Sequence, residues 1–179
     1  YTFDANNNRT QVVETTPSGT KTVDYTYDKL NRLTSANYSD GTYEMYTYDS
    51  SGNRKTKTTH TGTTNYEYDG DNRLIKAGNT IFFYDNSGNL IKKMSADKTE
   101  NYTYDYENRL IEYSDNTDIV KFEYDGDGNR ISKTVNGVKT KYVNHVLSPI
   151  TQVLLETDTN NYVTNRYAYG FSRINQISQ

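Results

Sequence analysis

One short pattern recurs along almost the whole chain: two aromatic residues two positions apart, followed directly by aspartate. In an extended chain, residues two positions apart point to the same side, so both rings of a copy lie on one face of a strand. The aspartate then ends the strand, because its carboxylate can accept hydrogen bonds from the backbone of a turn. A period near 20 residues accommodates two strands and two turns, so the sequence predicts repeated β-hairpins. Copies spaced 16 to 24 residues apart end at Asp4, Asp28, Asp49, Asp69, Asp85, Asp105 and Asp125.

The residues after each aspartate come in two alternating forms. In the first, as in residues 28–32, asparagine stands three positions after aspartate and precedes arginine. In the second, as in residues 49–53, asparagine stands four positions after aspartate, usually behind glycine. Gly52 and Asn53 tolerate positive φ, which lets the chain reverse, and we expect the second turn to be one residue longer. The alternation predicts a higher repeat of about 40 residues, with a bulge that bends the sheet.

The predicted site residues are the members of these motifs, and their predicted role is structural. They are Tyr25, Tyr27, Asp28, Asn31, Arg32, Tyr46, Tyr48, Asp49, Gly52, Asn53, Arg54, Tyr66, Tyr68, Asp69, Asn72, Arg73, Tyr84, Asp85, Gly88, Asn89, Tyr102, Tyr104, Asp105, Asn108, Arg109, Tyr124, Asp125, Gly128, Asn129 and Arg130.

A second set of turn signals lies between successive copies. Asp40-Gly41, Gly78-Asn79 and Asn136-Gly137 are typical of short hairpin loops with positive φ. We therefore expect an all-β meander in which each strand is antiparallel to the last, and a sheet that curls because strand twist accumulates. Residues 1–145 form the hairpin repeats in this prediction. Residues 146–179 form a degenerate repeat, in which Gly170 replaces the aspartate as His145 does one copy earlier.

Composition decides which classes of protein remain. Only 32% of residues are hydrophobic and the mean hydropathy is −0.99, but 19 Tyr can build an aromatic core that hydropathy scales undervalue. The net charge of −3 offers no basic surface for a nucleic-acid backbone, so nucleic acid is excluded as an expected partner. No apolar run approaches the ~20 residues of a membrane span, and no signal peptide is recognisable. The chain reads as a fragment of a longer repeat protein, without disulfides because it has no Cys.

The motifs Tyr-x-Tyr-Asp-x-x-Gly-Asn-Arg and Tyr-x-Tyr-Asp-x-x-Asn-Arg-Leu resemble the YD repeats of the Rhs family. That family includes bacterial Rhs and wall-associated polymorphic toxins, cocoon components of insecticidal toxin complexes, and animal teneurins. The resemblance covers nearly the whole chain, and residues 147–170 are similar to the segment before the Rhs-associated core. It implies a spiralling hairpin sheet that forms a partial shell, often around a C-terminal toxin, and a secreted or cell-surface bacterial parent. The core motif Asp-Pro-x-Gly-Leu is absent, so no catalytic residue is carried over.

Each candidate chemical site has a plain structural explanation. The segment 125–129 resembles part of a calcium loop but lacks the distal glutamate, and we interpret it as a turn. His60 and His145 are the only histidines, and neither has neighbours suited to general-base catalysis. The repeated aspartates fit turn capping better than catalysis, and we expect the arginines to pack over Tyr rings or bind carbonyls rather than acidic ligands. The sequence predicts no catalytic, metal-binding or cofactor-binding residue.

Three classes of function remain. The leading hypothesis is a non-catalytic structural module, the wall of a shell that encloses or presents a C-terminal toxin or another polypeptide. The alternative is a carbohydrate-binding or adhesion module that uses exposed Tyr, Asn and Arg side chains to bind glycans. An enzyme would require a convergent polar pocket. The first and last strands of a repeat array have unpaired backbone groups, so we also expect edge-to-edge self-association.

Overall fold

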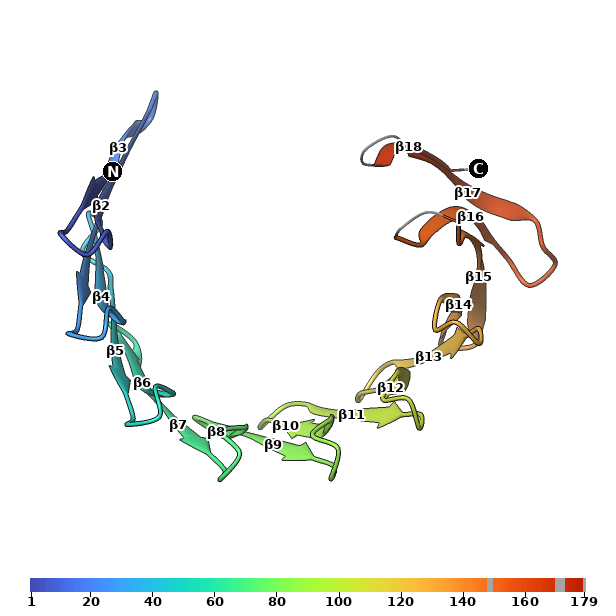
Figure 1. The fold of residues 1–179 in the computed structure, drawn as a ribbon, viewed down its shortest axis with the longest axis horizontal. Helices are drawn as coiled ribbons and strands as arrows, with labels where there is room; N and C mark the ends of the chain where they lie inside the picture. Colours follow the sequence, from blue (N-terminus) through green and yellow to red (C-terminus); the bar gives the residue numbers. More distant parts are fainter. Residues whose placement is uncertain (148–149, 170–172, 179) are drawn as a thin grey trace. The chain divides into compact units, whose positions relative to one another are not determined.

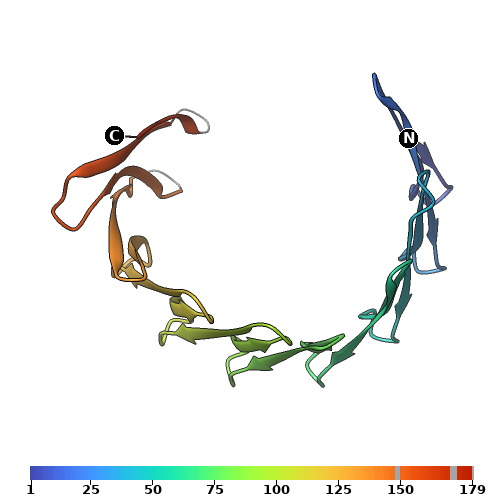
Figure 2. The same ribbon diagram turned by 180° about the vertical axis from the view of Figure 1, so that it is seen from behind.

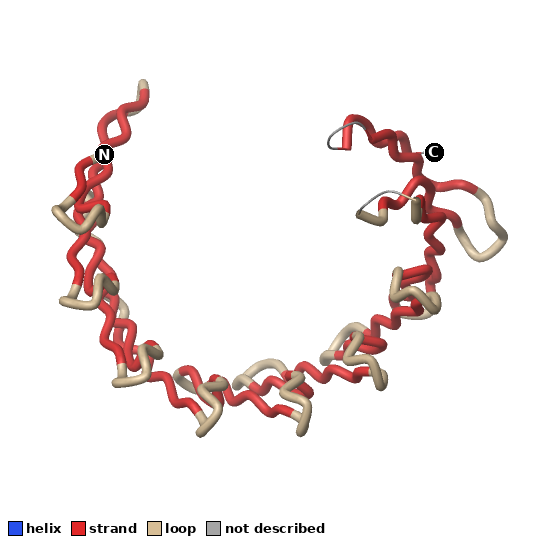
Figure 3. Tube along the Cα trace, in the orientation of Figure 1, coloured by secondary structure: helices blue, strands red, loops and turns tan. Residues whose placement is uncertain are grey.

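The computed structural model describes residues 1–147, 150–169 and 173–178, and every regular element in this part of the chain is a β-strand (Figure 3). The described residues therefore include no helix that could cross a membrane. The chain divides into two compact units, Tyr1–Ile81 and Phe82–Gln179, and the boundary falls within strand β9. The predicted division into residues 1–145 and 146–179 rests on the sequence repeat instead, and it stays a prediction. Gly170 lies outside the described residues.

In the N-terminal unit, each strand pairs antiparallel with the strand that follows it in the chain. The strands are β1 (Thr2–Phe3), β2 (Arg9–Thr16), β3 (Gly19–Tyr27), β4 (Leu33–Tyr38), β5 (Tyr43–Tyr48), β6 (Arg54–Thr59), β7 (Gly62–Tyr68), β8 (Leu74–Ala77) and the first residues of β9 (Thr80–Tyr84).

In the C-terminal unit β9 pairs with the strand that follows it, and each later described strand is antiparallel to the next. Its strands are the rest of β9, then β10 (Leu90–Met94), β11 (Thr99–Tyr104), β12 (Leu110–Ser114), β13 (Ile119–Tyr124), β14 (Arg130–Val135), β15 (Val138–His145), β16 (Gln152–Thr157), β17 (Val163–Tyr169) and β18 (Arg173–Ser178). The predicted all-β fold of antiparallel hairpins is thus confirmed.

The aromatic pairs give the strands their two faces. In β11, Tyr102 and Tyr104 are half-buried while Thr103 between them is exposed, as the two-residue period of a strand requires. The rings therefore gather on one face, and threonine and other small polar residues occupy much of the other. The same alternation occurs at the paired aromatic positions of β3, β5, β7, β9 and β13.

A β-bulge accompanies the hairpins of both alternating forms. The register shifts by one residue between Thr47 and Tyr48, and likewise between Thr103 and Tyr104. The predicted bulge is present, but it does not arise from the alternation of turn forms, because hairpins of both forms carry one. Bulges increase local twist and bend a sheet. Within each unit the sheet is accordingly curved rather than flat (Figure 1 and Figure 2).

Both units are single-layered. Ala36, at 2% exposure, is the only buried hydrophobic residue in the described part of the chain. The 19 Tyr do not form the expected aromatic core within either unit, because the described segments provide no second layer that covers the aromatic face. The rings bury only the area that neighbouring hairpins cover, so most of the stabilisation lies between sequential hairpins.

Candidate functional site

Each motif aspartate closes a turn at one edge of the sheet. One carboxylate oxygen of Asp105 accepts hydrogen bonds from the backbone N–H groups of Glu107 at 2.9 Å and Arg109 at 3.0 Å. The Asn108 N–H donates to the Asp105 carbonyl at 3.0 Å. The bond from the Arg109 backbone contributes most to lowering the pKa of the Asp105 carboxyl, because it favours the ionised form. The same carboxylate-to-backbone bond is made by Asp4, Asp28, Asp49, Asp69, Asp85 and Asp125.

The two sequence forms have turns of the same length. The third residue after the aspartate takes positive φ in both, with 59° at Asn31 and 90° at Gly52. The prediction of a longer second turn is therefore wrong, and of the pair Gly52-Asn53 only Gly52 takes positive φ. Gly52 and Asn31 are thus equivalent, as the third residue after the aspartate. Asn53 is the fourth residue after its aspartate, and its equivalent in the other form is Arg32. The remaining positive-φ residues at this position are Asn7, Asn72, Gly88, Asn108, Gly128 and Asn161.

Asparagine at the fourth position links its own turn to the next one. The Asn53 side-chain amide donates to the Asp49 carboxylate at 3.2 Å and to the Asn72 side-chain carbonyl at 2.7 Å. At Asp85 the hydrogen bond from the Asn89 side chain is the largest cause of the lowered pKa of the carboxyl. Two hairpins are thereby joined at their tips. The same contact joins Asn8 to Asn31 at 2.8 Å and Asn89 to Asn108 at 2.7 Å.

Arginine at the fourth position makes the alternate link. Arg109 Nε contacts the Asp105 carboxylate at 2.7 Å, and Arg109 Nη1 donates to the Asp125 carbonyl at 3.4 Å. The same guanidinium lies over the Tyr124 ring, 5.1 Å from its centroid. Arg109 therefore contacts its own turn, the following turn and the following strand, which is the packing expected from the sequence. Arg32 makes the equivalent contacts to Asp28, Asp49 and Tyr48, and Arg73 contacts Asp69 at 2.7 Å.

In several copies the hydroxyl of the second tyrosine donates a hydrogen bond to a backbone carbonyl of the preceding strand, next to a bulge. The Tyr48 hydroxyl donates to the Leu33 carbonyl at 2.7 Å, and the Tyr124 hydroxyl donates to the Leu110 carbonyl at 2.9 Å. Tyr27 makes the same bond to Arg9 at 2.8 Å. Each carbonyl belongs to the first residue after the preceding turn, next to the bulge. The hydroxyl thus replaces a backbone donor, which explains why tyrosine is suited to this position.

A further arginine follows three of the four turns of the asparagine form. Arg54 lies over the rings of Tyr46 and Tyr66, at 4.8 Å and 5.7 Å from their centroids. It connects the first aromatic residue of its own copy to that of the next copy through cation–π contacts. Arg130 does the same between Phe122 and Tyr142, at 5.5 Å and 5.3 Å.

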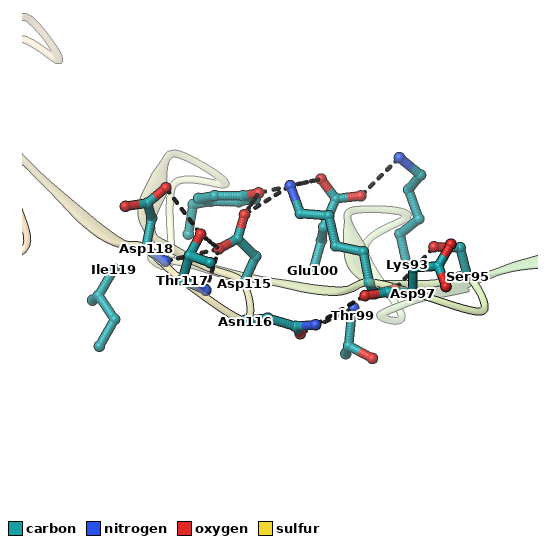
Figure 4. Close-up of polar contacts among 12 residues, drawn as sticks. Lys93, Ser95, Asp97, Thr99, Glu100, Asp115, Asn116, Thr117, Asp118 and Ile119 are labelled. Carbon is teal, nitrogen blue, oxygen red and sulfur yellow. Dashed lines mark hydrogen bonds and ion pairs between the residues drawn. The ribbon is translucent and has the colours of Figure 1, made fainter.

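The opposite edge of the sheet has its own links, which the sequence analysis missed. The Asn116 side chain contacts the Thr99 N–H at 3.4 Å and donates to the Asp97 carbonyl at 3.0 Å (Figure 4). Asn136 similarly accepts from the Ile119 N–H at 2.8 Å and donates to Asp118 at 2.7 Å. Both asparagines lie in loops between successive copies of the motif, so their recurrence about 20 residues apart was the available signal.

A charged cluster stabilises the same edge in the C-terminal unit. Lys98 contacts Asp115 at 2.7 Å and Glu100 at 3.3 Å, and Lys93 contacts Glu100 at 2.7 Å (Figure 4). The Tyr113 hydroxyl donates to Asp115 at 2.7 Å. The Asp115 side chain is only 5% exposed, and its bond with Lys98 is the main reason that the pKa of Asp115 is lowered. This is an ion-pair network that joins two loops and the strands β10 and β11 beside them, rather than a convergent catalytic site.

In the copy that ends at His145, a different residue makes the hydrogen bond that the second tyrosine makes elsewhere. Asn144 stands where other copies have the second tyrosine, and its side-chain amide donates to the Arg130 carbonyl at 3.0 Å. The bond matches that of Tyr124 to Leu110. His145 ends β15 as an exposed residue, and His60 lies in the loop between β6 and β7. Among the described residues, no group of three His, Cys, Asp or Glu side chains is placed to hold a metal ion.

The structure thus places the predicted site residues in two sets. The aromatic residues lie on the strands: Tyr25, Tyr27, Tyr46, Tyr48, Tyr66, Tyr68, Tyr84, Tyr102, Tyr104 and Tyr124. The others lie in the turns at one edge or directly after them, where bonds between successive hairpins connect them. No catalytic constellation emerges from the described residues.

Comparison with known proteins agrees with this geometry. The teneurin YD-shell family model matches residues 2–154. The tRNA nuclease WapA of Bacillus subtilis (strain 168) is 39% identical over 156 residues, which cover 82% of this chain and 6% of that protein. The tRNA(Glu)-specific nuclease WapA of Bacillus subtilis subsp. natto (strain BEST195) is 39% identical over 150 residues, which cover 84% of this chain and 4% of that protein. The chain therefore spans a small fraction of these relatives.

A solved structure shows the same fold. The crystal structure of TcdB2-TccC3 superposes with a TM-score of 0.63 at 16% sequence identity, covering 85% of this chain and 11% of that one. The likeness in structure, the family match and the repeated Tyr-Asp turns agree, and the chain belongs to the YD-repeat family described by the teneurin YD-shell model.

Proposed function

We propose that this chain is a non-catalytic part of the wall of a YD-repeat shell, and that the shell encloses or presents a C-terminal toxin or another polypeptide. The observation that carries the proposal is the single-layered sheet. Its turns are linked along both edges, yet its aromatic residues are only half-buried. A face of this kind is completed when another polypeptide covers it, because further burial of the aromatic surface is favourable.

The proposal extends to the location and partners of the parent protein. Its partners are the remainder of the shell and the enclosed domain, and its location is outside the bacterial cell or on the cell surface. The named relatives are tRNA nucleases, and we assign that chemistry to parts of such proteins other than the repeat wall. The reasons are the net charge of −3, which is unfavourable for binding the RNA backbone, and the structural use of the repeated aspartates and arginines.

The test uses the parent protein and limited proteolysis. We expect the segment that follows the repeats to resist protease while the wall is intact, and to become cleavable when wall turns are disrupted by combined Asp69→Ala and Asp105→Ala substitutions. An enclosed segment that is cut equally fast in both proteins would contradict the proposal. A catalytic wall would instead give the isolated chain activity on tRNA.

Carbohydrate binding is the second candidate, and a repeated groove favours it. A groove lined by Tyr66, Tyr68 and Asn72 lies between two successive turns of the N-terminal unit. The C-terminal unit has an equivalent groove at Tyr102, Tyr104 and Asn108. Tyrosine rings can stack on sugars while Asn and Asp bind hydroxyls. Titration of the chain on a glycan array tests this candidate, and no signal above that of a Tyr66→Ala and Tyr102→Ala variant would exclude it.

A further inference from the structure

One hairpin lacks an arginine that its counterparts possess. In three copies of the asparagine form, the fifth residue after the aspartate is arginine, and it lies over the first aromatic ring of the next copy at 5.3–5.7 Å. In the copy that begins with Asp85, this residue is Leu90. Among the described residues, no Arg or Lys lies over the Phe82 ring or the Tyr102 ring. The arginines of the other copies are Arg9, Arg54 and Arg130.

The nearby lysines do not fill this position. Lys93 contacts Glu100 at 2.7 Å, and Lys98 contacts Asp115 at the same distance. Tyr102 instead packs against Tyr113, with ring centroids 5.3 Å apart. Among the described residues, the Tyr102 ring therefore has no guanidinium over it, unlike the equivalent rings of Tyr25, Tyr66 and Tyr142.

The groove beside Tyr102 also has fewer cationic residues than the equivalent groove of the N-terminal unit. Ile91 lines it where Lys55 lines the other groove, and Tyr106 stands where the other has Gly70. Tyr106 is fully exposed, at 108%. The groove has thus lost a cation and gained an aromatic ring, and no Lys or Arg is among its lining residues.

Two polar groups in this groove remain available to a ligand. The Tyr104 hydroxyl has no hydrogen-bond partner among the described residues, whereas the equivalent hydroxyl of Tyr124 donates to a carbonyl. The Asp85 carboxylate accepts bonds from Ser87 and Asn89 but forms no ion pair in the described structure. An uncompensated carboxylate beside aromatic rings favours a cation with a flat apolar face.

We propose that the surface formed by Asp85, Tyr102, Tyr104 and Tyr106 binds the guanidinium of an arginine side chain supplied by a polypeptide in contact with the wall. The internal arginines provide the precedent for its position over a tyrosine ring. The inference rests on the proposed function only for the source of the arginine. Binding of the guanidinium itself is a property of this chain and is measurable without the parent.

The experiment is a nuclear magnetic resonance titration of the full 179-residue chain with N-acetyl-arginine amide. N-acetyl-citrulline amide serves as the uncharged control of nearly the same shape. We expect saturable shifts of the Tyr102, Tyr104 and Tyr106 ring signals with arginine, with a dissociation constant of about 1–10 mM for this single side chain. Citrulline should cause no saturable shift. Equal shifts with both compounds, or none with arginine, would overturn the inference.

Two variants locate the site. Leu90→Arg supplies the arginine found in the other copies, and we expect it to weaken binding at least tenfold. Tyr106→Gly reproduces the N-terminal groove at a fully exposed position, and it should weaken binding without disturbing the fold. Unchanged binding in both variants would refute the assignment.

A third variant tests the reverse change. Arg54→Leu combined with Lys55→Ile reproduces the Leu90-Ile91 pair in the N-terminal unit, and it should add a second, weaker set of arginine-dependent shifts at Tyr66. Absence of these shifts would contradict the role given to the missing arginine. If guanidinium binding fails while the enclosed segment of the parent still resists protease, the inference falls and the proposed function stands.

Discussion

The hydroxyl of Tyr124 provides a direct measure of what holds neighbouring hairpins together. It donates to the Leu110 carbonyl at 2.9 Å across the bulge. Tyr124→Phe removes this bond but keeps the ring beneath Arg109, whose guanidinium lies 5.1 Å from the ring centroid. A net loss of about 1 kcal/mol, within the usual 0.5–1.5 kcal/mol, is expected for one such bond.

Tyr104→Phe is the matched control in the same unit. Tyr104 is also half-buried and occupies the same position in its copy, but its hydroxyl has no hydrogen-bond partner among the described residues. Its replacement should change stability by less than about 0.3 kcal/mol, because only a solvated hydroxyl is lost. The difference between the two variants isolates the bond from the ring.

Native-state hydrogen exchange is the suitable assay, because repeat proteins open locally and a global melting curve averages over all hairpins. A loss of about 1 kcal/mol makes opening of the β12–β13 hairpin about fivefold more frequent. Amide exchange in β12 and β13 should therefore accelerate by that factor in Tyr124→Phe and remain unchanged in Tyr104→Phe. Equal acceleration in both variants would refute the argument that the hydroxyl-to-carbonyl bond joins the hairpins.

Three further predictions concern the turns and the aromatic face. Gly52→Ala should destabilise its hairpin by about 1 kcal/mol because φ is 90° there, whereas Gly70→Ala, at a position without positive φ and with open space, should change little in urea denaturation. The pKa of Asp85 is lowered from 3.8 in the folded chain, mainly by the hydrogen bond from Asn89. The stability that the ionised carboxylate contributes is therefore present above about pH 4 and is lost as the pH falls through the pKa of the folded state. Circular dichroism should show unfolding with acid but none between about pH 5 and 8. Burial and the Glu44 hydrogen bond raise the pKa of Tyr46 to about 12, and ultraviolet titration should show one tyrosine that ionises earlier in Glu44→Gln. A Gly70→Ala effect equal to that of Gly52→Ala, a flat acid profile, or an unchanged Tyr46 titration would contradict the respective reasoning.

The sequence determined the local structure of this protein. Aromatic residues two positions apart predict strands, because in a strand such residues lie on the same face. Asp, Asn and Gly predict turns, because the hydrogen bonds and positive φ angles of a turn depend on neighbouring residues only. It did not determine the alignment of the two turn forms. Gly52 and Asn31 are chemically different residues that meet the same demand for positive φ, and matching asparagine with asparagine led to the wrong turn length.

Contacts between hairpins were decided only by the tertiary structure. Nothing local in Asn53 specifies that its amide reaches Asn72, nor in Tyr48 that its hydroxyl reaches the Leu33 carbonyl. Such bonds join residues 15 to 19 positions apart, and their geometry depends on the bulge and the stagger of successive strands. The extent to which the aromatic rings are buried also depends on the tertiary structure. The two-residue period of a strand predicts that the rings share one face, but it does not predict whether another layer covers that face.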